Sequence, residues 1–319
     1  MIPELADIKE AHKRIASHIH QTPVFTSATL NRLCGGDVFF KCENFQKIGA
    51  FKVRGGCNTV FSLSNEEAAR GVITHSSGNH AAAVALAAKL RGIPARIVMP
   101  ENSPSVKIAA VKGYGGDITF CASHPAAREE TALRIVEETG AELIPSYNDP
   151  RVICGQGTAA LEFMEQVKDL DVVITPLGGG GLLSGTAVAA KGIDPGITVI
   201  GVEPAQVDDA YQSLKTGMIV TIDKPVSIAE GLLMPLREHT FPVIQKLVSE
   251  ILLVSEEEIV EAMRFVYERM KMIIEPSSAV VPAAILSGKI DIRGKRAGVI
   301  ISGGNVDMGV FFDWMRERG

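Results

Sequence analysis

Short apolar runs alternate with longer helix-like segments along nearly the whole chain of 319 residues. Most of these runs lack a polar alternation, which is typical of strands covered on both faces and therefore of parallel sheets. Parallel strands are joined by right-handed crossovers, usually through helices, so the pattern predicts an α/β fold. The predicted strands span residues 38–42, 72–75, 95–100, 117–121, 142–146, 172–176, 198–203, 251–254 and 298–302. The predicted helices span residues 79–91, 104–114, 125–138, 157–166, 182–191, 256–272 and 277–287.

The spacing of these segments predicts two domains. Residues 71–148 hold four strand–helix units, which are enough for a small sheet of their own. Residues 1–70 and 149–319 would then form a larger domain around a second sheet, with a cleft between the two. Ligands favour such clefts and the carboxyl ends of parallel strands, so we expect the functional residues there.

Charge and apolar content restrict the partners of the chain. The 32 Lys and Arg residues against 37 Asp and Glu give a net charge of −5, which excludes a broad electrostatic contact with nucleic acid. The apolar tracts 81–88 and 279–286 are too short to cross a bilayer, and residues 1–15 are too charged for a signal peptide. The five cysteines form no close C-x-x-C pair. We expect a cytoplasmic protein without a membrane or nucleic-acid partner.

Four consecutive glycines, Gly178, Gly179, Gly180 and Gly181, stand between a predicted strand and a predicted helix. Backbone without side chains lets several N–H groups converge, and the following helix N-terminus favours a negative charge. This favours a phosphate site over a simple tight turn. No Lys-Ser/Thr pair follows, so the run is not a nucleotide-hydrolase loop.

A second glycine pattern offers a rival interpretation. Residues 155–160, Gly-Gln-Gly-Thr-Ala-Ala, formally fit the dinucleotide fingerprint of a nicotinamide oxidoreductase. No convincing strand precedes them, and Asp171 is at the wrong distance to bind a ribose. A helix entry is the simpler explanation.

Lys52 lies in the run Gly49-Ala50-Phe51-Lys52-Val53-Arg54-Gly55-Gly56. Partial burial beside Phe51 and Val53 would lower the pKa of its amine and make that amine nucleophilic. From the local sequence alone, a surface lysine with a buried stem is an equal alternative.

Two further segments carry polar groups at predicted strand ends. His75-Ser76-Ser77-Gly78-Asn79-His80 gathers hydroxyl, amide and N–H groups at a helix N-terminus, a setting suited to a carboxylate, although Ser77 alone also fits a plain helix cap. Ser302-Gly303-Gly304-Asn305 follows the last predicted strand and also fits a turn.

In their order and spacing, these four segments resemble the fold type II pyridoxal-phosphate enzymes, in the branch of serine racemases and serine/threonine dehydratases. The resemblance extends from about residue 7 to residue 307 and includes the stretches 39–43 and 273–276. It implies two domains with parallel sheets, a cleft between them, and pyridoxal 5′-phosphate as the cofactor. It also implies a homodimer.

The resemblance assigns roles to individual residues. Lys52 would form the imine with the cofactor and move the Cα proton on one face of the substrate. Phe51 would flank the ring, Asn79 would contact the 3′-hydroxyl, Gly178 to Gly181 would hold the phosphate, and Ser302 would face the pyridine nitrogen. A hydroxyl at that nitrogen leaves it neutral, which suits elimination and racemisation.

The residues expected to contact the substrate include Ser77, on which the choice between racemisation and elimination depends. By the resemblance, Ser76, Asn79 and His80 would hold the substrate carboxylate, and Arg128 would reach the far end of the substrate. Racemisation needs a proton donor opposite Lys52, and the Ser77 hydroxyl can supply it. Dedicated dehydratases of the family often carry alanine at this position, so Ser77 favours a racemase.

The same resemblance implies two further ligands. The loop after residue 203 would hold Mg²⁺ or Ca²⁺ on Glu203, Asp209 and the carbonyl of Val207, and such oxygen ligands suit these ions. Lys47, Lys107, Tyr114 and Asn305 match an ATP-activation site at the dimer interface. Ala28 and Ile48 replace polar residues there, so nucleotide activation is left open.

We therefore expect an enzyme that interconverts L- and D-serine and also eliminates ammonia from serine or threonine to give a keto acid. The alternatives are a dedicated dehydratase for threonine, serine or 3-hydroxyaspartate, and the nicotinamide oxidoreductase. Lys52, Ser77 and Asn79 argue against a catalytically silent relative.

Overall fold

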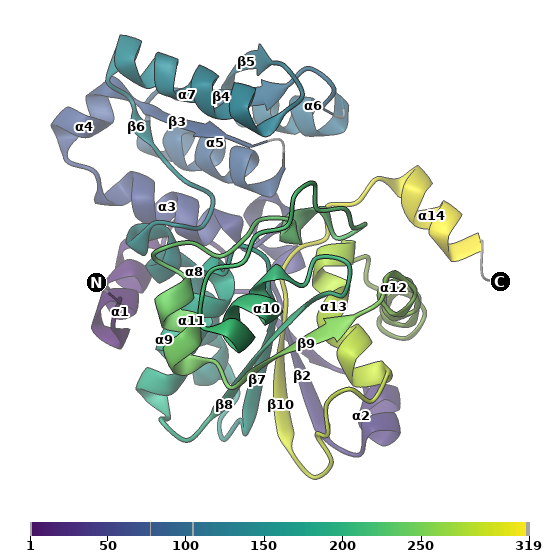
Figure 1. The fold of residues 1–319 in the computed structure, drawn as a ribbon. Helices are drawn as coiled ribbons and strands as arrows, with labels where there is room; N and C mark the ends of the chain where they lie inside the picture. The colour runs from purple at the N-terminus through teal and green to yellow at the C-terminus, as the bar shows by residue number, and fades with distance from the viewer. Residues whose placement is uncertain (1, 77, 104, 317–319) are drawn as a thin grey trace.

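Two separate β-sheets with helices on their faces organise the chain (Figure 1). The structure is a computed structural model and describes residues 2–76, 78–103 and 105–316. The predicted α/β class is confirmed. The division into domains with boundaries near residues 71 and 148 stays a prediction.

The large sheet has six strands in the order β1-β2-β10-β7-β8-β9. All neighbouring strands are parallel except β1 and β2, which pair antiparallel at one edge. Its strands are β1 (Val24–Thr26), β2 (Asp37–Cys42), β7 (Val172–Pro176), β8 (Thr198–Pro204), β9 (Glu250–Val254) and β10 (Arg296–Ile301).

The small sheet has four parallel strands in the order β5-β4-β3-β6. They are β3 (Val72–His75), β4 (Ala95–Pro100), β5 (Asp117–Cys121) and β6 (Glu142–Leu143). All four lie within residues 71–148, where the sequence predicts a sheet.

Several helices begin after a serine or aspartate that caps their N-terminus, and several end at a glycine in the left-handed conformation. The α-helices are α1 (Leu5–Ile15), α2 (Ala28–Cys34), α3 (Lys52–Ser62), α4 (Asn65–Arg70), α5 (Asn79–Arg91), α6 (Ser105–Gly113), α7 (Pro125–Thr139), α8 (Pro150–Gln166), α9 (Gly181–Ile193), α10 (Asp209–Thr216), α11 (Phe241–Leu247), α12 (Glu256–Met270), α13 (Pro276–Leu286) and α14 (Met308–Arg316). Short 3₁₀ turns are η1 (Glu43–Phe45), η2 (Lys47–Gly49) and η3 (Glu230–Leu232). In the part of the chain that is described, no helix is both long enough and apolar enough to cross a bilayer.

Both faces of the large sheet are buried, which explains the unbroken apolar runs of its strands. Successive residues of β7 point to opposite layers: Val173 packs in the core beneath α8 and α9, whereas Val172 and Ile174 pack beneath α12 and α13. The small sheet is covered in the same way, with Ile97 in one core and Val98 in the other.

The glycine pattern at residues 155–160 lies inside α8 and not at a strand-to-helix turn. Both of its glycines allow close helix packing: a Cβ on Gly155 would lie 2.6 Å from the Cα of Gly55, and one on Gly157 would lie 2.8 Å from the carbonyl of Gly185. The pattern therefore serves packing, and the dinucleotide interpretation is wrong. The helix also begins at Pro150, seven residues before the predicted start at 157.

Helix α3 connects the two sheet systems. It packs against α5, beside the small sheet, and against α8, beside the large sheet (Figure 1). Of the four segments that the sequence predicts to be functional, three follow the carboxyl ends of β3, β7 and β10, and the segment with Lys52 leads into α3. The topology thus brings candidate residues from both sheets toward α3.

Candidate active site

Lys52 is the first residue of α3, and its side chain is half-buried. Its ammonium donates a hydrogen bond of 2.9 Å to the carbonyl of Ser146, and it lies 5.1 Å from the centre of the Phe51 ring. Ser146 follows β6, so this contact reaches the small-sheet region. The sequence alternative of a plain surface lysine is thereby excluded.

The surroundings of Lys52 disfavour its positive charge. Burial lowers the pKa of the amine from 10.5 to about 8, and the nearby Glu275 carboxylate opposes this shift. The position at a helix N-terminus adds repulsion, because the free N–H groups there are partly positive. A neutral and therefore nucleophilic amine is thus accessible close to neutral pH.

The segment after β10 runs alongside the lysine segment. The Phe51 N–H donates to the carbonyl of Ser302 at 2.9 Å, and the Gly304 N–H donates to the carbonyl of Gly49 at 2.9 Å. An isolated antiparallel bridge joins Ala50 to Gly303. These backbone contacts hold the Ser302 segment against Phe51 and Lys52.

Ser302 is buried, and its hydroxyl lies 2.9 Å from the hydroxyl of Ser278. The Ser278 oxygen also accepts from the N–H of Gly303 and lies 2.7 Å from the Gly303 carbonyl. Ser278 therefore orients the Ser302 hydroxyl. Sequence reasoning missed it, although a polar pair, Ser277-Ser278, inside an otherwise apolar helix was the available indication.

Asn79 begins α5 and is held by two partners from the other end of the chain. Its amide nitrogen donates to both Glu275 oxygens at 3.1 Å, and its amide oxygen accepts from Asn305 at 2.8 Å. Burial raises the pKa of Glu275 to about 7. Glu275 was also missed as a site residue; a carboxylate in the apolar run Ile273-Ile274-Glu275-Pro276 was the indication.

The four-glycine loop follows β7 and leads into α9, with Gly180 at a φ of 86°. The N–H groups of these glycines donate no hydrogen bond to the described residues outside their own helix. Each glycine also has a steric role, since a Cβ on Gly178 would lie 2.6 Å from Leu232 and one on Gly179 would lie 2.6 Å from the Tyr147 ring. The loop thus combines free N–H groups with close packing, as an anion site at a helix N-terminus requires.

Tyr147 joins the glycine loop to the lysine. Its buried ring lies against Gly179 and its Cβ and backbone lie against Gly181, while the carbonyl of the preceding Ser146 accepts from Lys52. The segment after β6 therefore contacts both parts of the site. Sequence reasoning assigned it no role.

The predicted substrate loop follows β3. The half-buried Ser76 hydroxyl accepts from the Gly78 N–H at 3.2 Å. His80 is buried; its Nε2 lies 3.1 Å from the carbonyl of Ile144, and its Nδ1 has no partner among the described residues. Burial lowers the pKa of His80 to about 3, so the ring is neutral and presents Nδ1 as an acceptor. Ser77 lies outside the described residues.

Arg128 lies on α7 and is half-buried, and its charge acts on His75 at the end of β3. Burial, followed by the charge of Arg128, lowers the pKa of His75, the residue directly before Ser76. The guanidinium forms no ion pair within the described part of the chain. Arg128 is therefore close to the predicted substrate loop and is free to bind an anion.

Two carboxylates predicted to bind a metal lie at the end of β8 and the start of α10. Glu203 and Asp209 are both buried, and burial raises their pKa values to about 9 and about 6. Glu203 accepts from the Tyr211 N–H at 2.7 Å, and neither carboxylate has an ion-pair partner in the described chain. Buried carboxylates without a basic partner fit a divalent cation, which would compensate their charge. In the described ranges no cluster of three or more His, Cys, Asp or Glu forms a metal site, so a backbone carbonyl such as that of Val207 would have to contribute.

Two of the four residues predicted for nucleotide activation have other partners here. Lys107 forms an ion pair of 2.7 Å with Glu230, and Asn305 donates to Asn79 and to the carbonyl of Ile48. Nucleotide activation and the homodimer both stay predictions.

A lysine amine with a lowered pKa beside a glycine loop with free N–H groups, on a scaffold of two mainly parallel sheets, fits an enzyme that acts on a phosphorylated carbonyl compound. Comparison with known proteins then gives the family: the chain belongs to the family described as "Pyridoxal-phosphate dependent enzyme", whose profile matches residues 15–303. The predicted resemblance is confirmed.

Individual relatives match over almost their full length. The serine racemase of Dictyostelium discoideum is 52% identical over 95% of this chain and 95% of its own. The β-hydroxyaspartate dehydratase of Paracoccus denitrificans is 50% identical over 96% of this chain and 98% of its own. Among solved structures, maize serine racemase is similar with a TM-score of 0.96 and 46% identity, covering 100% of this chain and 98% of its own.

The residues present fit pyridoxal phosphate. The half-buried amine of Lys52 supplies the group that holds an aldehyde, and the free N–H groups of the glycine loop supply an anion site. The Nδ1 of buried His80 also has no partner among the described residues, which is compatible with a ligand in this part of the chain.

Proposed function

We propose that Lys52 holds the aldehyde carbon of pyridoxal phosphate and that the N–H groups of Gly178 to Gly181 hold its phosphate. Phe51 would pack against the ring, Asn79 would contact its 3′-hydroxyl, and Ser302 would face its nitrogen. The observation that carries this proposal is the convergence on Lys52 of the Ser302 segment, through Phe51, and of the glycine loop, through Ser146 and Tyr147.

Bound pyridoxal phosphate withdraws electrons from the α-carbon of an amino acid and so makes its α-proton acidic. The amine of Lys52, with its pKa near 8, can take up this proton and return it on the same face. Ser302, fixed by Ser278, presents a hydroxyl and not a carboxylate. It therefore contributes no charge to the site.

We infer that the chain interconverts L- and D-serine and also eliminates ammonia from serine or threonine to form a keto acid. By the resemblance, the Ser77 hydroxyl would stand on the face opposite Lys52 and deliver a proton there, which supports racemisation. The serine racemases among the relatives support the same reaction.

The carboxylate of the substrate would bind at the start of α5, to Ser76, Ser77 and Asn79. The N-terminal end of a helix favours a negative charge, which supports this placement. The predicted contact of His80 with that carboxylate would require a protonated ring, since the neutral ring presents an acceptor. Arg128 would bind the far end of the substrate, supported by its closeness to His75.

The first prediction separates the two reactions by Ser77→Ala. D-serine formation from L-serine should fall by about 100-fold or more, the usual contribution of a positioned acid or base. Keto-acid formation from L-serine should stay within a few-fold of wild type, because it needs a proton moved only on the Lys52 face. Chiral chromatography and a keto-acid assay on one reaction mixture measure both rates.

Ser17→Ala is the matched control, since Ser17 is exposed and far from the site in the sequence. It should leave both rates unchanged. Equal loss of racemisation and elimination in Ser77→Ala would show that Ser77 does not act as the second proton donor.

The second candidate is a dedicated dehydratase for L-threo-3-hydroxyaspartate. The unpaired guanidinium of Arg128 favours it, because a second carboxylate would bind there, and the Paracoccus relative carries a related name. Its distinguishing result would be rapid keto-acid formation from hydroxyaspartate with no D-serine from L-serine.

We also propose that Glu203, Asp209 and the carbonyl of Val207 bind Mg²⁺ or Ca²⁺. The prediction is that either ion raises the melting temperature of the wild type, by the equivalent of about 2.7 kcal/mol at one hundred times its Kd. EDTA should reverse the shift. Glu203→Gln should abolish it, whereas Glu165→Gln, an exposed control, should not. An equal shift in Glu203→Gln and wild type would contradict the site.

A further inference from the structure

The amide of Asn79 is bound on its nitrogen by a carboxylate from the other end of the chain. This nitrogen lies 3.1 Å from both oxygens of Glu275, the residue directly before α13. The two oxygens of one carboxylate lie in nearly the same direction from it, whereas the two N–H groups of an amide diverge widely. One N–H therefore binds Glu275, and the other has no acceptor among the described residues.

The oxygen of the same amide is held by Asn305. It accepts a hydrogen bond of 2.8 Å from the side-chain nitrogen of Asn305, which also donates to the carbonyl of Ile48 at 2.7 Å. Ile48 has a φ of 63°, a left-handed conformation that is costly for a β-branched residue. Because the Ile48 carbonyl takes the nitrogen of Asn305, the orientation of the Asn305 amide is fixed as well.

Glu275 is the buried member of this arrangement, whereas Asn305 is exposed. In the part of the chain that is described, Glu275 forms no ion pair, and Gly303 leaves room for it, since a Cβ there would lie 2.7 Å from its Oε1. Turning the Asn79 amide over would place its oxygen against the Glu275 carboxylate and its nitrogen against the nitrogen of Asn305. Both contacts are repulsive, and the one with the buried charge costs more.

We propose that Glu275 is a positioning residue that turns the Asn79 amide so that an N–H group, and not the carbonyl, faces the 3′-oxygen of pyridoxal phosphate. An N–H donor stabilises the ionised form of that oxygen, whereas an acceptor in its place requires the oxygen to keep its proton. Glu275 thereby sets the protonation of the cofactor, which its absorbance reports. This inference rests on the proposed function, in which Lys52 holds the cofactor and Asn79 contacts its 3′-oxygen.

The first test is the absorbance of Glu275→Gln loaded with pyridoxal phosphate. The new amide can bind either end of the Asn79 amide, so the short-wavelength band of the protonated 3′-oxygen should rise about threefold relative to the long-wavelength band, the effect of about half a pKa unit. Loss of a nearby negative charge by itself would favour the ionised oxygen and shift the bands the other way. In an Asn79→Ala background, Glu275→Gln should leave the ratio of the bands unchanged.

The second test separates orientation from stability by exchanging the two functional groups. Asn79→Asp alone places two carboxylates together and should lower the melting temperature of the loaded enzyme. In the double variant Asn79→Asp/Glu275→Gln, an amide again binds a carboxylate, so the melting temperature should recover. The absorbance should not recover, because an oxygen then faces the 3′-oxygen; the ratio of the two bands should differ from wild type by about tenfold, one pKa unit.

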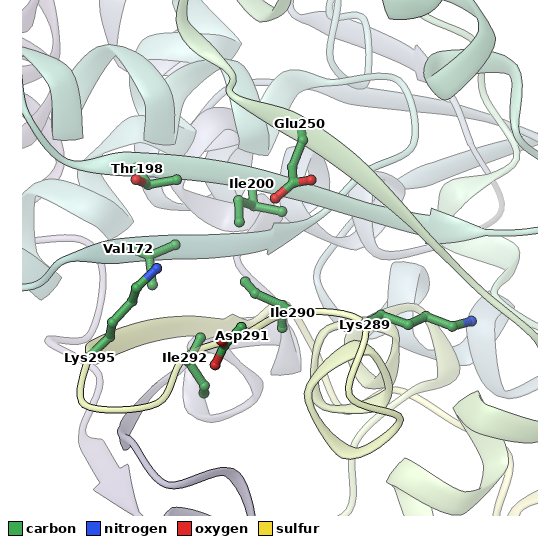
Figure 2. A pocket seen from close by; sticks show the side chains of 9 residues that line it. All are labelled: Val172, Thr198, Ile200, Glu250, Lys289, Ile290, Asp291, Ile292 and Lys295. Carbon is green, nitrogen blue, oxygen red and sulfur yellow. The ribbon is translucent and has the colours of Figure 1, made fainter.

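Glu250→Gln is the matched control. Glu250 is exposed at the start of β9, and Figure 2 shows it beside Ile200 at a cavity of about 240 Å³. Strands β10, β7, β8 and β9 are parallel, so the start of β9 lies at the edge of the sheet opposite to the end of β10, which leads to Asn305. Glu250→Gln should change neither the melting temperature nor the absorbance.

Three outcomes would overturn the proposal. They are a Glu275→Gln spectrum that is unchanged or shifted to the long-wavelength band, the same shift in the Asn79→Ala background, and a double variant that recovers the absorbance together with the melting temperature. Glu275→Gln replaces one oxygen by nitrogen, and its melting curve verifies that it is folded. Failure of the proposed function gives a different result: after borohydride reduction of the wild type, peptide mass spectrometry would find no cofactor on Lys52.

Discussion

At the scale of the residue, the site depends on how the fold disfavours one positive charge. Lys52 is half-buried and stands at a helix N-terminus, and both factors oppose its protonation. Glu275 opposes this shift only in part, since burial raises its own pKa to about 7. Keeping this amine reactive therefore lowers the stability of the fold, and this loss of stability can be measured.

The prediction is that Lys52→Met makes the apoenzyme, prepared by removing the cofactor, more stable by about 3 kcal/mol at pH 7. The folded lysine loses its proton near pH 8, but the unfolded one keeps it until about pH 10.5. Between these values the unfolded state binds more protons, so the stability of the wild type rises with pH and the difference disappears.

Urea unfolding at pH 7 and pH 10.5 measures this difference. Lys9→Met, at an exposed position, should show no such pH-dependent gap. A gap of the same size at both pH values would mean that packing, and not the charge of Lys52, causes it.

At the scale of the element, α3 is fixed by a buried cluster of charges around Arg54, two residues after Lys52. Arg54 contacts Glu43 of η1 at 2.7 Å and Glu162 of α8 at 3.2 Å, and all three side chains are buried. Lys41 of β2 also pairs with Glu162 and donates to the carbonyl of Thr22 at 2.8 Å. Two cations and two anions make the cluster neutral, and it joins three elements around the start of α3.

Arg54→Met should therefore destabilise the protein by about 3–5 kcal/mol, because it leaves buried carboxylates without their partner. Guanidinium unfolding of the cofactor-loaded protein measures the loss. Arg32→Met, at an exposed position on α2, should change the stability by less than about 0.5 kcal/mol. A small loss in Arg54→Met would mean that water or a neighbouring cation compensates the carboxylates.

At the scale of the whole molecule, the sequence predicted the strands better than the contacts between them. The predicted β3, β4, β5 and β7 have the observed bounds, because short strand-like runs between helices define them clearly. The three-residue β1 was missed, since a short edge strand depends on its partner β2 and has little pattern of its own. The predicted strand 142–146 is only Glu142–Leu143, because Pro145 cannot donate to a sheet.

The candidate site shows the same limit. Lys52, Asn79 and the glycine loop stand in recognisable local patterns, so the sequence located them. Glu275, Ser278 and Tyr147 contact them across long stretches of chain, and only the fold brings these residues together. A steric need for glycine beside Tyr147 or Leu232 likewise cannot be inferred from the glycine run itself.

An ion pair also connects the two sheet systems. Lys107 of α6, beside the small sheet, pairs with Glu230 of η3 at 2.7 Å. The same turn contains Leu232, which packs against Gly178 of the glycine loop. This ion pair therefore links the small-sheet side to the predicted phosphate site.

Glu230→Gln should lower kcat/KM by about threefold and change the stability by less than about 1 kcal/mol, because the pair is exposed. Salt screens exposed charges, so added NaCl should lower kcat/KM of the wild type toward that of the variant and have little effect on the variant itself. Steady-state kinetics at two ionic strengths measure this. Glu66→Gln, which breaks a pair within α4 alone, should keep the salt response of the wild type. The same salt response in Glu230→Gln as in wild type would show that this pair does not couple the two sheets.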